Sequence, residues 1–310
     1  MSITLASSLP DVFNRALASH PVRPNILALE GKPWDVTHGA RCLFTQQTQW
    51  KSAPSEPPSG WPFDLEWIQV ASAGVDTLPP WAYKVPLVTR GAGAHAPAIA
   101  EFVIGAVFAH EKRFWNGNVS EPARWVPHAL GSVAGKTMGI AGVGEIGREC
   151  ARLALALGMR VCGMTRSANL APGIERVDSF PALLAVSDHL VLALPLTVET
   201  RGIVNRETLR HARKGLHLIN IARGSMIDDA ALLQALDDRR LSGATLDVTS
   251  PEPLPAGHRL YTHPAVRLTP HISGAVDDAD ARMSAVVLAN FDCWLHGRPL
   301  RGVVNPATGY

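Results

Sequence analysis

Short apolar runs alternate with stretches of helical period through the middle of the chain. The β-rich runs occupy residues 137–143, 160–165, 189–194, 216–221 and 243–248, and helical patterns fill 146–157, 180–186, 207–213 and 228–237 between them. Strands that alternate with helices in this way predict parallel strands with helices on both faces of the sheet. The pattern therefore predicts an α/β fold built on a doubly wound parallel sheet.

The segments before and after this alternating region have a different hydrophobic pattern. Strand-like runs at 26–29, 67–70 and 85–88 are separated by proline-rich turns, and the dense proline stretch at 54–62 predicts a surface loop. Apolar residues recur at three- and four-residue steps over 97–114, and a last helical pattern covers 283–296. We expect the first of these helices to cross from one domain to the next.

Composition narrows the class of protein. With 310 residues, 46% of them hydrophobic, the chain is long enough for two domains, each with its own core. A formal net charge of +2 offers no basic field, so we expect no nucleic-acid partner. The start of the chain lacks the features of a signal peptide, and no window offers eighteen apolar residues in a row. We expect a soluble cytoplasmic protein without a membrane partner.

The cysteines favour a reducing compartment. They lie far apart and form no C-x-x-C pair and no His/Cys spacing typical of a metal site; they are Cys42, Cys150, Cys162 and Cys293. We therefore expect small core residues, with neither a disulfide framework nor a bound metal.

A glycine fingerprint follows the first strand of the alternating region. Gly142, Gly144 and Gly147 form G-x-G-x-x-G, enclosing Glu145 and Ile146 where a helix begins. The first glycine permits a tight turn, the second lets backbone approach a pyrophosphate, and the third lets the helix pack close to the strand. The helix N-terminus then offers N–H groups to phosphates, which predicts a dinucleotide site.

The next strand end indicates which dinucleotide. An NAD enzyme usually has Asp or Glu there for the ribose 2′-hydroxyl, whereas this chain has Thr165, Arg166 and Ser167. A guanidinium pairs with a 2′-phosphate, and the two hydroxyls can donate to it. NADP is favoured over NAD; if Arg166 is only a solvated loop residue, both cofactors bind.

Three chemically active side chains follow later strands in order. Arg223, Glu252 and His271 each come after a short apolar run, and strand ends are where open α/β sheets bind ligands. Arg223 can hold a carboxylate and its adjacent keto oxygen, His271 can exchange a proton with that oxygen, and Glu252 can fix the tautomer of the imidazole. Taken singly, each residue could equally serve a structural turn.

Five segments in this order resemble the D-isomer-specific 2-hydroxyacid dehydrogenases. They are residues 134–147, 194–203, 220–225, 246–254 and 269–274, within a resemblance that spans about 65–305. The chain looks most similar to the glyoxylate/hydroxypyruvate reductase branch, partly because of Arg166. Glu145 departs from the basic residue that is commoner at its position, and the N-terminal 60 residues match poorly, which leaves the substrate open.

The resemblance implies a role for each matched position. Arg223 is the substrate arginine, Glu252 the acidic partner and His271 the acid/base, while the amides of Ala73 and Gly74 receive the substrate carboxylate. The resemblance also implies contacts to the cofactor from further residues, namely Leu194, Pro195, Thr200, Ile221, Ala222, Arg223, Asp247, His271 and Gly274. Asp247 could accept from the carboxamide or make a structural hydrogen bond at its strand end.

Together, the residue patterns and the resemblance predict an α/β fold with two Rossmann-like domains. Residues 1–97 and 284–310 would form the substrate (catalytic) domain, with the dinucleotide-binding domain, 98–283, inserted into it. The expected reaction is NAD(P)H-dependent reduction of a small 2-keto acid, glyoxylate or hydroxypyruvate, to the 2-hydroxy acid. The resemblance also implies a homodimer. We expect its interface in the 97–130 region, which is rich in aromatic residues such as Phe114, Trp115 and Trp125.

Two alternatives stay open. One is a sibling oxidoreductase acting on another anion such as formate or phosphite, although relatives that use formate carry Gln where this chain has Glu252. The other is a dinucleotide-sensing binding protein, comparable to transcriptional corepressors built on this fold. Such proteins need an exposed peptide groove and often disordered tails, and the sequence has neither an obvious tail nor a charge-biased segment.

Overall fold

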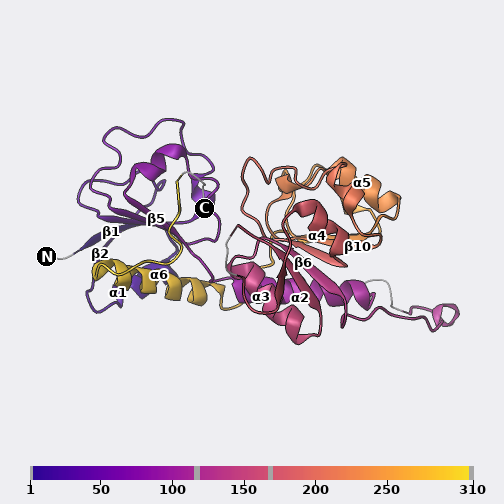
Figure 1. Ribbon diagram of the computed structural model, residues 1–310. Coiled ribbons are helices and arrows are strands. Elements are labelled where there is room, and N and C mark those ends of the chain that lie inside the picture. The colour runs from indigo at the N-terminus through magenta and orange to yellow at the C-terminus, as the bar shows by residue number, and fades with distance from the viewer. Residues whose placement is uncertain (1–2, 115–118, 167–169, 307–310) are drawn as a thin grey trace. The chain divides into compact units, whose positions relative to one another are not determined.

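A computed structural model describes residues 3–114, 119–166 and 170–306. The chain divides into two compact units: unit 1 is Met1–His95 with Val276–Tyr310, and unit 2 is Ala96–Ala275. Both units contain a sheet in which every paired strand is parallel (Figure 1). Unit 2 is thus inserted in sequence between the two segments of unit 1.

Unit 1 is built on a five-stranded sheet in the order β2-β1-β3-β4-β5. The strands are β1 (Thr4–Ser7), β2 (Asn25–Ala28), β3 (Cys42–Thr45), β4 (Trp67–Val70) and β5 (Leu87–Arg90). Helices α1 (Asp11–Ala18) and α6 (Ala279–Leu295) pack on one face through Phe13, Val287 and Phe291. The other face is covered by loops and by the 3-10 helices η1 (Gln47–Trp50) and η2 (Pro80–Lys84), with Trp50 and Trp81 buried in that layer.

Unit 2 is built on a seven-stranded sheet in the order β12-β11-β10-β9-β6-β7-β8. Its strands are β6 (Thr137–Ala141), β7 (Arg160–Met164), β8 (Ile174–Arg176), β9 (His189–Leu192), β10 (Leu216–Asn220), β11 (Leu241–Leu246) and β12 (Val266–Leu268). Its α-helices are α2 (Ala96–Glu111), α3 (Glu145–Ala156), α4 (Phe180–Val186) and α5 (Asp229–Asp237). Short 3-10 helices complete it: η3 (Pro122–Arg124), η4 (Thr208–His211), η5 (Gly224–Met226) and η6 (Arg259–Tyr261).

Helices cover both faces of the unit 2 sheet. Helices α2 and α3 share one hydrophobic core with β6, whereas α4 and α5 belong to another core on the opposite face (Figure 1). The strand order reverses between β6 and β9, because the chain leaves β6 towards β7 on one side and returns to β9 on the other. In sheets of this kind, ligands bind outside the carboxyl ends of the strands at such a switch point.

The predicted α/β class with parallel sheets is confirmed, as are the alternating elements of the middle region. Helix α4 has its predicted bounds, and the other helices and strands of this region begin and end within a few residues of theirs. One prediction is wrong in type: residues 207–213 hold only the 3-10 helix η4, since Asn205 and Thr208 tie the segment into a hydrogen-bonded turn.

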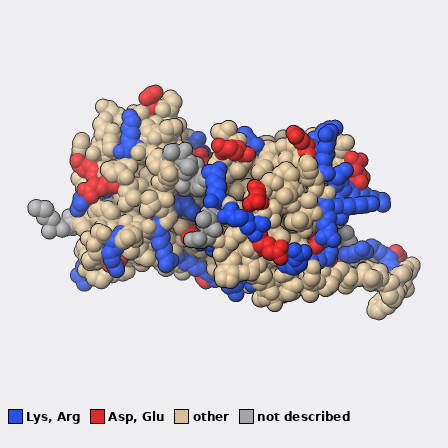
Figure 2. Space-filling model, viewed as in Figure 1, with Lys and Arg blue, Asp and Glu red and all other residues tan. Residues whose placement is uncertain are grey.

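A segment of unit 2 projects from its body after α2 (Figure 1). Every residue from Val119 to Leu130 is exposed, and the side chain of Trp125 is 77% accessible. Much of this projection is tan in Figure 2, whereas Lys, Arg, Asp and Glu are interspersed over the rest of the visible surface. Among the helices of the described residues, none combines the length and the apolar character that a membrane span requires.

Candidate active site

The candidate trio occupies three neighbouring strand ends of unit 2. Strands β10, β11 and β12 lie side by side, with Asn220 paired to Leu246 and Leu246 paired to Leu268. Arg223, Glu252 and His271 follow these three paired residues, so the sheet brings their backbone segments to one edge. The sequence prediction of strand-end positions therefore matches the sheet register.

Two members of the trio are in direct contact. Nδ1 of His271 lies 3.1 Å from Oε2 of Glu252, and the backbone N–H of Thr249 donates to Oε1 of the same carboxylate at 3.2 Å. The carboxylate is thereby fixed at both oxygens. The imidazole side chain is 53% exposed, so its other nitrogen can reach a molecule from solvent. A carboxylate at Nδ1 favours the tautomer with its proton there, which leaves Nε2 to exchange protons.

The backbone of His271 is held in an unusual conformation. Its φ angle is +56°, in the left-handed region that costs a residue with a side chain about 1 kcal/mol or more. The His271 N–H donates to the carbonyl of Asp247 at 2.8 Å. The buried carboxylate of Asp247, 1% exposed, accepts from Thr269 Oγ1 at 2.6 Å and from the backbone N–H groups of Ile272 and Ser273, both at 2.8 Å. Asp247 therefore clamps the turn that carries the imidazole.

The turn that carries Arg223 is fixed by a second buried polar residue. Asn220 is fully buried; its amide donates to the carbonyl of Arg223 at 3.0 Å and its oxygen accepts from the N–H of Ala222 at 3.0 Å. Arg223 Nη1 donates to the Ala222 carbonyl at 2.7 Å. A Cβ on Gly224 would lie 1.9 Å from the carbonyl carbon of Thr249, so only glycine lets the β10 and β11 ends approach this closely.

The glycine fingerprint has the geometry that a dinucleotide needs. Gly142 has φ +100°, and a Cβ there would lie 2.6 Å from the carbonyl oxygen of Ala193, in the segment after β9. A Cβ on Gly147 would meet the Gly142 carbonyl at 2.2 Å, which fixes the close approach of α3 to the strand. Gly144, the N-cap of α3, has nothing within 4 Å of a Cβ, so the space beside its backbone is open. An open helix N-terminus at the switch point fits a pyrophosphate. Glu145 and Ile146 form its first turn.

The residues predicted for the ribose end lie after β7. Arg166 is exposed, and its Nη2 lies 3.9 Å from a carboxylate oxygen of Glu199, in the loop that follows β9. Hydrogen bonding from the Thr197 hydroxyl is the largest cause of the lowered pKa of Glu199, to which the charge of Arg166 also contributes. Arg176 donates to the carbonyl of Thr165 at 3.4 Å, which adds a second guanidinium at this strand end. Ser167 lies outside the described residues.

The remaining predicted cofactor residues are distributed around the same edge of unit 2. Thr200 donates to the carbonyl of Pro195 at 2.7 Å and accepts from the N–H of Thr197 at 2.7 Å, so its hydroxyl holds the loop after β9 together. Ile221 and Ala222 are buried after β10, whereas Leu194 and Gly274 are half-buried.

The predicted carboxylate-binding loop belongs to unit 1. Ala73 and Gly74 follow β4 and are half-buried. The Ser72 hydroxyl donates to the carbonyl of Gly74 at 3.0 Å, and Arg90 Nη1 donates to that of Ala73 at 3.4 Å. These contacts use the carbonyl groups of the loop, which orients the peptide units.

Two positioning residues were not predicted from the sequence. Asn220 and Thr269 were noted only as parts of matched segments, and neither received a role. A signal for Asn220 exists in the chain, since a polar residue at the end of an apolar run such as 216–221 must find buried partners. Nothing local indicates that Thr269 donates to Asp247, because the two residues lie 22 positions apart.

Comparison with known proteins adds to this geometry. Residues 104–273 match the family model described as "D-isomer specific 2-hydroxyacid dehydrogenase, NAD binding domain". A D-3-phosphoglycerate dehydrogenase of Bacillus subtilis is 34% identical over 226 residues, which cover 71% of this chain but only 43% of that protein. A glyoxylate reductase of Thermofilum pendens is 31% identical over 280 residues, covering 85% of this chain and 80% of that protein.

A solved structure is similar over the whole chain. It is an NADPH-dependent glyoxylate/hydroxypyruvate reductase from Sinorhizobium meliloti in complex with NADP and sulfate. The TM-score is 0.81 at 27% sequence identity, and the match covers 100% of each chain.

Proposed function

Because this chain belongs to the D-isomer specific 2-hydroxyacid dehydrogenase family, we propose that it reduces a small 2-keto acid to the 2-hydroxy acid with a nicotinamide cofactor. Glyoxylate and hydroxypyruvate are the first candidates, since the Thermofilum pendens and Sinorhizobium meliloti proteins carry those names. The observation that carries the proposal is the 3.1 Å contact between His271 and Glu252 at the edge of the sheet that also holds Arg223.

Each member of the trio has a defined task. Arg223 binds the carboxylate and the keto oxygen, which orients the carbonyl and stabilises the negative charge that develops on its oxygen. His271 donates a proton from Nε2 to that oxygen. Glu252 keeps the ring in the tautomer and orientation that this transfer requires, and it stabilises the imidazolium form. When bound, the reduced nicotinamide supplies the hydride.

The cofactor-holding residues are those around the switch point. Gly142, Gly144 and Gly147 with the first turn of α3 would receive the pyrophosphate. Arg166, assisted by Thr165 and Ser167, would pair with a 2′-phosphate, so NADPH is the preferred cofactor and NADH a weaker one. The exposure of Arg166 supports this role, because the guanidinium is accessible to an incoming phosphate.

The two units would have different roles. Unit 2 holds the cofactor and the trio, and unit 1, with the amides of Ala73 and Gly74, receives the substrate carboxylate as the substrate domain. Small side chains leave backbone N–H groups accessible to an anion. The proposed functional domains have sequence boundaries near residues 97 and 283. The compact units of the structure instead divide after His95 and before Val276.

The test is direct. Purified protein with NADPH or NADH and a panel of glyoxylate, hydroxypyruvate and bulkier keto acids should oxidise the cofactor, and D-3-phosphoglycerate should be tried in the reverse direction because one relative bears that name. His271→Asn, which keeps a polar planar side chain, should lose nearly all turnover while cofactor binding persists. No turnover with any acid, or full turnover in His271→Asn, would contradict the proposal.

We also propose a homodimer that uses the projecting segment. Phe114, Val119, Trp125 and Val126 are exposed on it or at its base, and patches of this kind usually mark protein contacts. Trp115 lies outside the described residues. Light scattering after gel filtration should give twice the chain mass, and Trp125→Ser should shift the mass towards the monomer; a monomeric parent protein would refute the assembly.

A further inference from the structure

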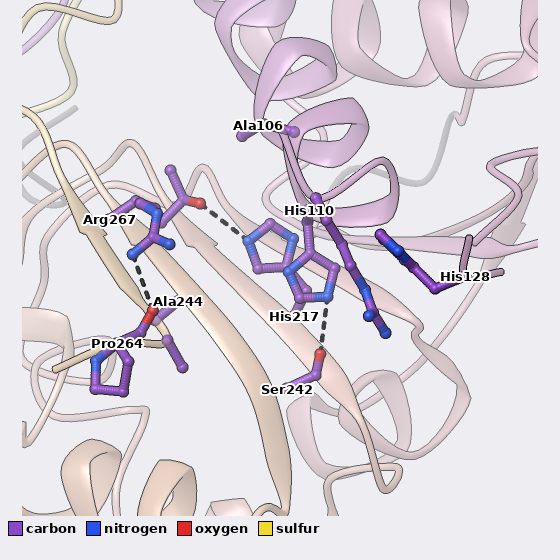
Figure 3. Close-up of a pocket in the computed structure, with 12 residues that line it drawn as sticks. Ala106, His110, His128, His217, Ser242, Ala244, Pro264 and Arg267 are labelled. Carbon is purple, nitrogen blue, oxygen red and sulfur yellow. Dashed lines mark hydrogen bonds between the residues drawn. The ribbon is translucent and has the colours of Figure 1, made fainter. Parts of the chain in front are cut away.

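A cluster of three histidines, two of them buried, lies beside the amino-terminal ends of β9 and β10, away from the strand ends that carry the trio. His189 begins β9, His217 lies near the start of β10, and His110 lies near the end of α2. His110 and His217 stack with ring centroids 4.1 Å apart and planes within 6° (Figure 3). His189 is 0% exposed and His217 is 2% exposed. None of these groups takes part in the proposed reaction.

The hydrogen bonds of the cluster dictate its tautomers. Ser242 Oγ donates to the Gly215 carbonyl at 2.6 Å, so it accepts from Nε2 of His110 at 3.0 Å. Nε2 of His189 lies 3.1 Å from a carboxylate oxygen of Glu111, which is also paired with Lys136 at 2.9 Å, and this nearby carboxylate favours a proton on Nε2 although the contact lacks hydrogen-bond geometry. Nδ1 of His189 then accepts from Nδ1 of His217 at 3.1 Å.

His217 Nε2 is therefore an acceptor, and it takes the hydroxyl proton of Thr245 at 2.9 Å. Burial lowers the pKa of His110 to about 4, helped by the charge of His189, and burial likewise lowers the pKa of His217. Burial therefore opposes protonation of His110 and His217 near neutral pH.

A cavity of about 430 Å³ opens beside this network. Its floor is small and apolar, with Ala106, Ala109, Ala244 and Ala265, and the imidazole pair forms a flat polar wall. This volume falls within the range of small-molecule sites. All its lining residues belong to unit 2, and the lining drawn from the described residues includes no Asp or Glu.

Two guanidinium groups line the cavity. Arg113 and Arg267 contribute to its lining, as does His128. Nη1 of Arg267 donates to the carbonyls of Pro264 at 2.9 Å and Val266 at 2.7 Å, which orients its guanidinium. In the view of Figure 3, Arg267 and His128 lie on opposite sides of the imidazole pair. Among the described residues, the permanently charged groups of the lining are Arg113 and Arg267.

We propose that this cavity is a second ligand site, distinct from the trio, that binds a small planar carboxylate. The apolar floor and the flat imidazole face suit a planar body, and the two guanidinium groups suit carboxylates, which they bind in a bidentate manner. A metal ion is not the ligand this geometry favours, because no three His, Cys, Asp or Glu side chains among the described residues are arranged to hold one. The proposal goes beyond the proposed reaction and does not depend on it.

The experiment is an NMR titration of the full-length protein labelled in its histidine rings. Isophthalate is the probe, the protein is saturated with NADP⁺, and the His110 resonance is assigned by its loss in His110→Asn. We expect a saturable shift of the His110 signal, at least tenfold weaker affinity in Arg267→Gln and in Arg113→Gln, and no change in Arg15→Gln, an exposed residue of unit 1. Two arginine variants keep the test valid if one of them fails to fold.

Several results would overturn the proposal. One is a His110 shift that does not saturate, and another is an affinity for isophthalate in both arginine variants equal to that of the parent protein. A third is a response confined to the His271 signal, which would report binding at the trio instead. A His110 signal that ignores isophthalate but moves when the protein is diluted would show that a second copy of the chain covers the cavity. Because no turnover is measured, failure here is distinct from failure of the reductase proposal.

Discussion

The carboxylate of Asp247 offers the sharpest test of how the trio is positioned. Its two oxygens accept three hydrogen bonds from the segment 269–273, and Asp247→Asn removes the charge with almost no change in shape. The amide oxygen can still accept from Thr269 and Ile272, as Oδ1 does in the parent protein. The new NH2 group then faces the N–H of Ser273, where Oδ2 stood.

The expected loss of kcat in Asp247→Asn follows from these two donors facing each other. A buried donor left without an acceptor costs about 1–3 kcal/mol, and about 1.4 kcal/mol in the transition state is a tenfold change in rate. If the turn relaxes and His271 leaves its left-handed conformation, kcat should fall roughly 10- to 100-fold. Thr269→Val, which removes one donor and leaves the two backbone donors in place, should cost only a few-fold.

Steady-state kinetics with NADPH and the preferred keto acid separate the two roles open to Asp247. A clamp on His271 predicts a loss in kcat with the KM for NADPH nearly constant. A contact with the nicotinamide carboxamide predicts the reverse, a raised KM for NADPH with kcat largely kept. The second pattern, together with unchanged urea stability, would refute the clamp.

Three further outcomes are expected. Gly224→Ala should destabilise the protein by about 1–3 kcal/mol in urea unfolding, because the new Cβ meets the Thr249 backbone, whereas Gly105→Ala, in open space on α2, should not. Stability should fall as the pH drops from 6.5 towards 4, since the unfolded chain protonates His110 before the folded protein does, and His110→Gln should flatten that dependence in pH-resolved urea melts. Arg166→Gln should raise the KM for NADPH roughly tenfold and leave that for NADH unchanged.

The fold of unit 2 was more predictable than that of unit 1, for a physical reason. Parallel strands buried on both faces give continuous apolar runs, and helices packed on them show a clear period, so β6, β7, β9, β10 and β11 stood out. The edge strand β8 (Ile174–Arg176), which has two exposed residues out of three, was missed. In unit 1, β1, α1 and β3 were missed. Two of these are four-residue strands, and the third is an eight-residue helix that follows Pro10 without a side-chain cap. Length alone does not explain these misses, since the four-residue strand β4 and the seven-residue helix α4 were predicted.

The strand-end positions of Arg223, Glu252 and His271 were predictable because each residue follows its own apolar run, and the sheet register then aligns those runs. The supporting contacts were not. Asp247 meets its three donors 22, 25 and 26 positions further along the chain, and only the pairing of β11 with β12 brings them together. A sequence read in windows indicates which side chains sit at strand ends; it does not indicate which of them hold the others in place.

The histidines of unit 2 illustrate why residue type alone does not assign a role. An imidazole that donates and recovers a proton must carry both charge states at little cost, which requires contact with solvent or substrate and a carboxylate to stabilise the cation. His271, 53% exposed beside Glu252, meets both requirements. His217 is 2% exposed among other imidazoles, and burial lowers its pKa, so protonation there is opposed. The environment of each imidazole, and not its residue type, therefore decides whether it can transfer a proton. Burying the His271 ring should abolish proton transfer even with Arg223 and Glu252 in place.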